Sequence, residues 1–82
     1  MTVELTKKAK SQLKKLPKQQ ATKITRILLA LQWTPLLGKK LEGKLQDRYS
    51  LRAWPYRIIY QIFTDNKIVL INTIEHRQGA YK

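Results

Sequence analysis

The 82-residue sequence contains no cysteine, one histidine and only five acidic residues. Without thiols it cannot form disulfides or a thiolate metal site, and so few histidines and carboxylates argue against a metal cage. No apolar run approaches the roughly 20 residues that a membrane span needs. Charged residues lie within the first ten positions, and no signal-peptide pattern is present. We therefore expect one cytoplasmic domain over residues 1–82, with no cofactor and no metal.

Positive charge, in contrast, is abundant. Seventeen lysines and arginines face five acidic residues, which gives a formal net charge of +12. A chain with so one-sided a charge repels itself and attracts polyanions. Nucleic acid, the ribosome and an acidic protein partner are the candidates. A lysine-rich surface that serves solubility alone is the alternative, and the size of the excess weakens it.

The pattern of apolar residues predicts a strand over residues 2–5 followed by two helices. Thr6 is suited to cap a first helix that continues through Leu16. An apolar stripe repeats along it at helical spacing: Ala9, Leu13 and Leu16. Pro17 fits the first turn of a second helix, which runs to about Trp33. We expect the Trp33 side chain to close this helix onto the core.

Glycine and lysine punctuate residues 36–47, which read as a loop. Three strands are predicted after it, at 49–53, 56–63 and 67–75. The order is therefore β-α-α-β-β-β, an α+β fold with an antiparallel-type sheet. The two N-terminal helices must pack on one face of this sheet, because their apolar stripes have no other surface to cover.

Alternation along the strands separates cations from apolar side chains. Arg52 alternates with Leu51, and Arg57 alternates with Ile58. Arg52, Arg57 and Arg77 can therefore share the second face of the sheet, although the register is open at the sequence level. His76 falls on the side opposite to Arg77, with the even-numbered residues Leu70, Asn72 and Ile74. We interpret it as a structural or partner-contact residue, with general acid as the alternative.

Three motifs stand in order near the end of the chain: Tyr49-x-Leu51-Arg52, Tyr56-Arg57-Ile-Ile-Tyr60 and His76-Arg77-x-x-x-Tyr81. Together with the preceding helices they resemble the RelE/ParE superfamily, the toxins of bacterial type II toxin–antitoxin pairs. The resemblance covers nearly the whole chain. It implies the β-α-α-β-β-β fold and an antitoxin, expected to be acidic, that wraps the toxin in a hetero-oligomer. In the RelE branch it implies mRNA cleavage in the ribosomal A site. The sister ParE branch poisons DNA gyrase.

The resemblance also implies roles for single residues. Arg57 resembles the arginine that contacts the scissile phosphate, and Arg77 the one that stabilises the transition state. Tyr81 resembles a tyrosine that stacks on an mRNA base and takes part in catalysis. Arg52 occupies a position that holds a lysine in well-known members. A second lysine of that strand would fall at Ser50, so the general base is left open.

These residue types suit metal-independent RNA cleavage by the ribose 2′-hydroxyl. Guanidinium groups donate paired hydrogen bonds to phosphate oxygens and offset the charge of the transition state. A tyrosine with an ordinary pKa near 10 is a poor base at neutral pH, and nearby cations would lower that pKa. Tyr81 acting as a base and Tyr81 acting as a stacking platform both remain open.

The remaining cations are too dispersed for one site, and we expect them to attach the protein to ribosomal RNA. This group comprises Lys7, Lys8, Lys10, Lys14, Lys15, Lys39, Lys40, Lys44 and Arg48. A merely solvated helix face is the alternative for the lysines of the first helix. Trp54 precedes Pro55 in a predicted turn, where it would be exposed to RNA or to the antitoxin.

Overall fold

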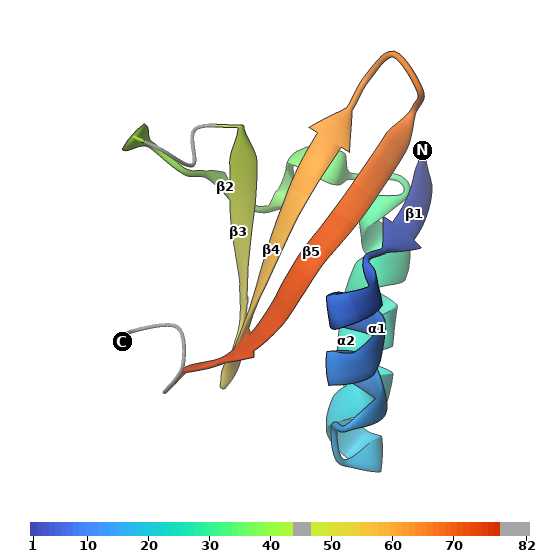
Figure 1. Cartoon of the computed structure of the whole chain (residues 1–82), viewed down its shortest axis with the longest axis vertical. Coiled ribbons are helices and arrows are strands. Elements are labelled where there is room, and N and C mark those ends of the chain that lie inside the picture. The colour runs from blue at the N-terminus through green and yellow to red at the C-terminus, as the bar shows by residue number, and fades with distance from the viewer. Residues whose placement is uncertain (44–46, 78–82) are drawn as a thin grey trace.

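A computed structural model describes residues 1–43 and 47–77 of the chain (Figure 1). The helices and strands follow the expected β-α-α-β-β-β order, with two short additions between α2 and β3. Their bounds are β1 Thr2–Leu5, α1 Lys7–Lys14, α2 Lys18–Leu31, η1 Pro35–Leu37, β2 Lys39–Lys40, β3 Arg48–Ala53, β4 Tyr56–Phe63 and β5 Ile68–His76. The predicted α+β fold is confirmed.

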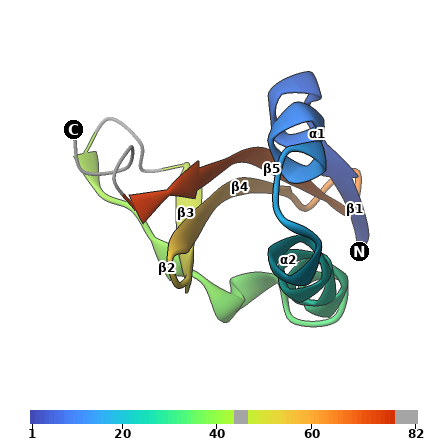
Figure 2. The ribbon, with the colours of Figure 1, turned by 90° about the horizontal axis from the view of Figure 1, so that it is seen from below.

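The sheet has five strands in the order β1-β5-β4-β3-β2. Strands β2 to β5 pair antiparallel, as expected, whereas β1 runs parallel to β5 and makes the sheet mixed. Both helices lie at the β1 side of the sheet, and β3 and β2 extend away from them (Figure 2). The β2–β3 end of the sheet therefore has little helical cover.

The segment predicted as a loop contains two regular elements, the 3₁₀-helix η1 and the strand β2. Strand β2 pairs with β3, with Lys39 opposite Ser50 and Lys40 opposite Tyr49. Two residues are too few to show an alternating pattern, so the sequence carries no signal for this strand. Its formation depends on the edge of β3, which only the folded sheet provides.

A buried hydroxyl fixes this segment to the sheet. The Tyr60 hydroxyl donates a hydrogen bond to the Pro35 carbonyl and accepts one from the Gly38 N–H, each at 2.8 Å. A Cβ at position 38 would lie 2.7 Å from that hydroxyl oxygen, so the close approach requires glycine. Burial raises the pKa of Tyr60, although the hydrogen bond from Gly38 acts in the opposite direction.

Helix α1 begins as predicted, at the cap Thr6, whose hydroxyl oxygen accepts a hydrogen bond from the Ala9 N–H at 3.1 Å. Both helices end two residues before their expected limits, at Lys14 and Leu31. Their buried faces join strand residues in one core cluster, which comprises Ala9, Ile24, Leu28, Leu31, Ala53, Ile58, Tyr60, Val69, Ile71 and Ile74. Each of the larger side chains contributes about 1.5–3 kcal/mol by its burial.

Strand β5 corrects the predicted alternation. A register shift lies between Ile59 and Tyr60, so Ile71 and Ile74 both face the core although they are three residues apart. Leu70 pairs with Gln61 and does not share a face with Ile74, contrary to the prediction. Simple parity fails here because a bulge inserts an extra residue into one strand.

Side chains at the start and in the middle of α1 form hydrogen bonds with backbone groups of β5 next to the bulge. The Gln12 Oε1 atom accepts a hydrogen bond from the Ile74 N–H at 2.7 Å. The Thr6 hydroxyl donates to the Asn72 carbonyl at 2.8 Å. Because β1 ends at Leu5, these side chains take over pairing that a neighbouring strand would otherwise supply.

The prediction for Trp33 is wrong. Its side chain is 84% exposed and lies beyond the end of α2, so it does not close the helix onto the core. Leu29, Leu36 and Leu37 are also exposed. We call these four residues the apolar patch. The prediction failed because Trp33 comes four residues after the exposed Leu29, so helical spacing places it opposite the buried stripe of α2.

Candidate functional site

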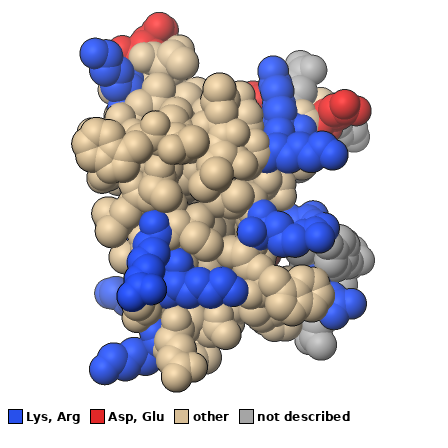
Figure 3. All heavy atoms as spheres, turned by 180° about the vertical axis from the view of Figure 1, so that it is seen from behind, with Lys and Arg blue, Asp and Glu red and all other residues tan. Residues whose placement is uncertain are grey.

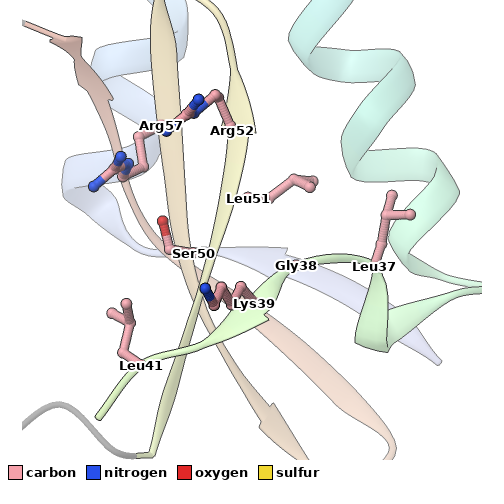
Figure 4. A pocket seen from close by; sticks show the side chains of 8 residues that line it. All are labelled: Leu37, Gly38, Lys39, Leu41, Ser50, Leu51, Arg52 and Arg57. Carbon is pink, nitrogen blue, oxygen red and sulfur yellow. The ribbon is translucent and has the colours of Figure 1, made fainter. Parts of the chain in front are cut away.

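Two arginines from adjacent strands lie on the same side of the sheet. Arg52 on β3 and Arg57 on β4 are direct cross-strand partners, and both extend away from Leu51 and helix α2 (Figure 4). Like charges placed directly opposite each other destabilise a sheet. Glu75 on β5 is the next residue in this row, opposite Arg57, and it offsets part of the positive charge.

A surface cavity of about 480 Å³ opens beside this pair, and we call it the basic pocket. It is lined by Leu37, Gly38, Lys39, Leu41, Ser50, Leu51, Arg52 and Arg57. Three of these residues are cationic, and none of the described lining residues is acidic. A pocket with three cations and aliphatic walls is suited to bind a phosphate group.

Lys39 reaches the basic pocket through the short strand β2. Its Cα partner is Ser50, which lies on the same face of β3 as Arg52. The sequence placed Lys39 among the dispersed lysines, because residues 36–47 read as a loop. No sequence signal could have moved it into the arginine site, since β2 consists of two residues.

Arg77 is held at the β3–β4 turn and, in the described part of the chain, does not line the basic pocket. Its backbone N–H donates a hydrogen bond to the Pro55 carbonyl at 2.7 Å. Its guanidinium carbon lies 4.6 Å from the centroid of the Trp54 ring. The structure thus pairs Arg52 with Arg57 and pairs Arg77 with Trp54.

His76 does not face the arginine pair. It is the strand partner of Tyr56, and their rings meet edge to face with centroids 5.3 Å apart. His76 shares a face of β5 with Ile74, as predicted. The geometry is that of an aromatic packing contact.

The remaining site residues fall in four places. Tyr81 and Lys44 lie outside the described residues. Arg48 begins β3, where its Nε atom is 3.9 Å from the Asp47 carboxylate. Lys40 lies on β2 beside Lys39 but is not among the residues of the basic pocket. The α1 group, Lys7, Lys8, Lys10, Lys14 and Lys15, is exposed.

Among the charged side chains on the far side of the view in Figure 1, cations outnumber acids. Lysine and arginine side chains are spread over this face, whereas acidic side chains appear only towards its upper edge (Figure 3). Among the described residues, no cluster of histidine and carboxylate side chains could hold a metal ion. No helix in the described part of the chain is long and apolar enough to cross a membrane.

Comparison of the fold with solved structures defines a RelE-like domain. The crystal structure of the toxin–antitoxin complex RelBE2 from Mycobacterium tuberculosis matches with a TM-score of 0.86 and 32% identity, covering 93% of this chain and 96% of that one. The archaeal RelE–RelB complex from Pyrococcus horikoshii matches with a TM-score of 0.81 and 26% identity, covering 93% of each chain.

Sequence comparison gives the family. A family model described as the ParE toxin of the type II toxin–antitoxin system matches residues 3–81. A protein from Methanocaldococcus jannaschii named "Putative toxin RelE1" is 30% identical over 84 residues, which cover 98% of this chain and 93% of that protein. The chain therefore belongs to the ParE toxin family of type II toxin–antitoxin systems, with a RelE-like structure.

Proposed function

We propose that this toxin is an endoribonuclease of the RelE type, which cleaves mRNA in the ribosomal A site and so inhibits translation. One observation carries the proposal: the basic pocket, which the cross-strand partners Arg52 and Arg57 line together with Lys39. Glu75 lies opposite Arg57 in the same row, and a phosphate in the pocket would offer acceptors to both guanidinium groups.

In the proposed reaction the RNA supplies its own nucleophile. The ribose 2′-oxygen attacks the phosphorus, loses its proton to a base, and the bond from phosphorus to the 5′-oxygen breaks as that oxygen gains a proton. The products are a 2′,3′-cyclic phosphate upstream and a 5′-hydroxyl downstream. Arg57 and Arg52 would bind the phosphate oxygens, and the charge that develops in the transition state strengthens such contacts.

Arg77 and Tyr81 complete the proposed site. Arg77 would approach the phosphate from the β3–β4 turn, and Tyr81 would act as proton acceptor or as a stacking surface. The exposed α1 lysines, with Lys40, Lys44 and Arg48, would attach the toxin to ribosomal RNA. Such attachment brings the pocket to mRNA that the ribosome already holds.

We also propose that a cognate antitoxin neutralises this chain. The related crystal structures are toxin–antitoxin complexes. A net charge of +12 favours an acidic partner. The apolar patch offers exposed side chains on which an amphipathic antitoxin helix could pack, in the manner of other helix-in-groove complexes.

One observation favours a second candidate function. The matching family model carries the name of the ParE branch, whose toxins poison DNA gyrase. A toxin of that kind would not need the arginine pair for phosphate chemistry. The two functions differ in the damage they cause, which gives a direct test.

The test is to induce the toxin in growing cells and to map the 5′ ends of mRNA. We expect cuts phased with codons in translated messages. Arg57→Ala and Arg52→Ala should each reduce cleavage by about a hundredfold, because removal of one donor from such a site costs on the order of 3 kcal/mol. Arg26→Ala is the matched control, since Arg26 is exposed on α2 and does not line the basic pocket.

Each variant is checked for folding by its circular dichroism and by complex formation with the antitoxin. Intact messages together with a DNA-damage response would contradict the ribonuclease proposal and favour gyrase. Full growth arrest by the folded Arg52→Ala/Arg57→Ala double variant would show that the basic pocket is not the active site.

A further inference from the structure

Trp54 presents a large aromatic surface next to the arginines. It follows Ala53 at the end of β3, and its side chain is 54% exposed. Ala53 is buried in the core, whereas Arg52 is exposed, two residues before Trp54. Two residues of a strand span about 7 Å, so the Trp54 backbone lies within about that distance of Arg52, which lines the basic pocket.

The Trp54 residue is held in place by cations on both its backbone and its ring. The Lys23 ammonium group donates a hydrogen bond to the Trp54 carbonyl. The Arg77 guanidinium covers the ring, with its carbon 4.6 Å from the ring centroid. A cation of this kind occupies one face of an aromatic ring. Burial in the core does not explain this tryptophan, since more than half of its surface is exposed.

We propose that the Trp54 indole is a stacking platform for a nucleobase of single-stranded RNA, whose phosphate lies in the basic pocket. This inference rests on the proposed ribonuclease function and adds a base-binding site to it. Single-stranded RNA offers unstacked bases that stack on aromatic side chains. Arg77, on the other side of the indole, extends the stack and reinforces it.

The two tryptophans of the chain illustrate two kinds of surface. Trp33 belongs to the apolar patch, whose other members are leucines, and an exposed apolar surface suits a protein partner. Trp54 instead contacts Arg77 and follows Arg52 by two residues in the chain. An aromatic ring among cations is the composition of surfaces that bind single-stranded nucleic acid. Because every base has a π-face, this platform accepts any base.

The full-length Trp33→Phe variant tests the inference, because it leaves Trp54 as the sole tryptophan. The ligand is a dye-labelled 2′-O-methyl oligoribonucleotide, which binds but cannot supply the nucleophile. Anisotropy of the dye reports RNA binding, and indole emission in the same samples reports stacking. We expect binding to quench Trp54 emission, whereas an abasic oligonucleotide of equal length should bind by its phosphates without quenching.

Affinity gives a second readout. Trp54→Ala should weaken binding of the base-containing oligonucleotide by roughly 5-fold to 150-fold, as is typical for the loss of one aromatic platform. Trp54→Phe, which keeps a ring, should lose much less. Neither substitution should change the affinity for the abasic oligonucleotide.

The outcomes separate this inference from the proposed function. RNA binding without quenching would overturn the platform and leave the ribonuclease proposal standing. The same holds if Trp54→Ala weakens binding of the abasic and the base-containing oligonucleotide equally. If neither signal shows binding of the oligonucleotide, the platform is overturned, whereas the ribonuclease proposal is decided separately by the mapping of mRNA 5′ ends. Quenching by poly-L-glutamate but not by RNA would show that Trp54 faces an acidic protein, which also overturns the inference.

Discussion

At the scale of single residues, the site depends on which side of a strand each cation occupies. Lys39 and Lys40 are neighbours in the chain with the same charge, yet only Lys39 lines the basic pocket. Lys39 is opposite Ser50, and Lys40 is opposite Tyr49, because successive residues of a strand point to opposite faces. This pair provides a matched comparison.

We predict that Lys39→Ala reduces RNA cleavage by about tenfold or more, whereas Lys40→Ala has a much smaller effect. Charge-assisted hydrogen bonds to a ligand are worth about 1.5–3 kcal/mol, and only Lys39 is placed to make one in the basic pocket. Single-turnover cleavage of mRNA on programmed ribosomes measures the cleavage rate of each variant. Equal reductions in rate would mean that the lysines act only through net charge.

At the scale of elements, short segments owe their place to side chains from distant parts of the chain. Thr6 and Gln12 join α1 to the irregular part of β5. Tyr60 on β4 holds both η1 and the start of β2, and through them it shapes the wall of the basic pocket. The pocket is therefore a product of contacts between elements and not of β2 alone.

We predict that Tyr60→Phe lowers the free energy of unfolding by about 1–3 kcal/mol at neutral pH, because a carbonyl and an N–H lose their partner. Burial raises the pKa of Tyr60 in the fold, so above about pH 10 the unfolded chain releases this proton first. The free energy of unfolding of the wild type should then fall as the pH rises. The difference in this free energy between the wild type and Tyr60→Phe should become smaller.

Urea unfolding of both proteins from pH 7 to pH 11 measures this effect. Lysine titration is common to the two proteins and cancels in the comparison. A difference that stays constant across this range would show that the Tyr60 hydroxyl is not protected from ionisation by the fold.

At the scale of the whole molecule, the excess of cations dominates. Exposed lysines cover α1, while the arginines and Lys39 gather at the basic pocket. Binding to phosphates releases counterions, so the logarithm of the binding constant falls linearly with the logarithm of salt concentration. The two groups of cations should therefore have separable effects on attachment and on cleavage.

We predict that replacing Lys7, Lys10 and Lys14 by glutamine lowers the salt slope of ribosome binding by roughly 2 to 3, because each phosphate that a lysine neutralises adds about 0.7–0.9 to the slope. Cleavage by saturating toxin should change little. Binding measured across a salt series tests this, with Lys67→Gln in the β4–β5 turn as the control. An unchanged slope would mean that α1 is only a solvated face.

Much of the fold could be predicted from the sequence because the relevant signals are local. Thr6 caps a helix through its own hydroxyl, and in β4 the buried Ile58 and Tyr60 alternate with the less buried Arg57, Ile59 and Gln61. The bulge in β5 and the strand β2 could not be predicted in this way. Each depends on a partner far along the chain, such as Gln12 for the bulge or β3 for β2.

The sequence by itself determined the net charge, the order of the main elements and the separation of Arg52 from Leu51, because alternation is intrinsic to an extended backbone. Only the tertiary structure decided that Lys39 joins Arg52 and Arg57 and that Arg77 covers Trp54. These features require the strand register to be known. Long-range pairing sets the register, and no local pattern encodes it.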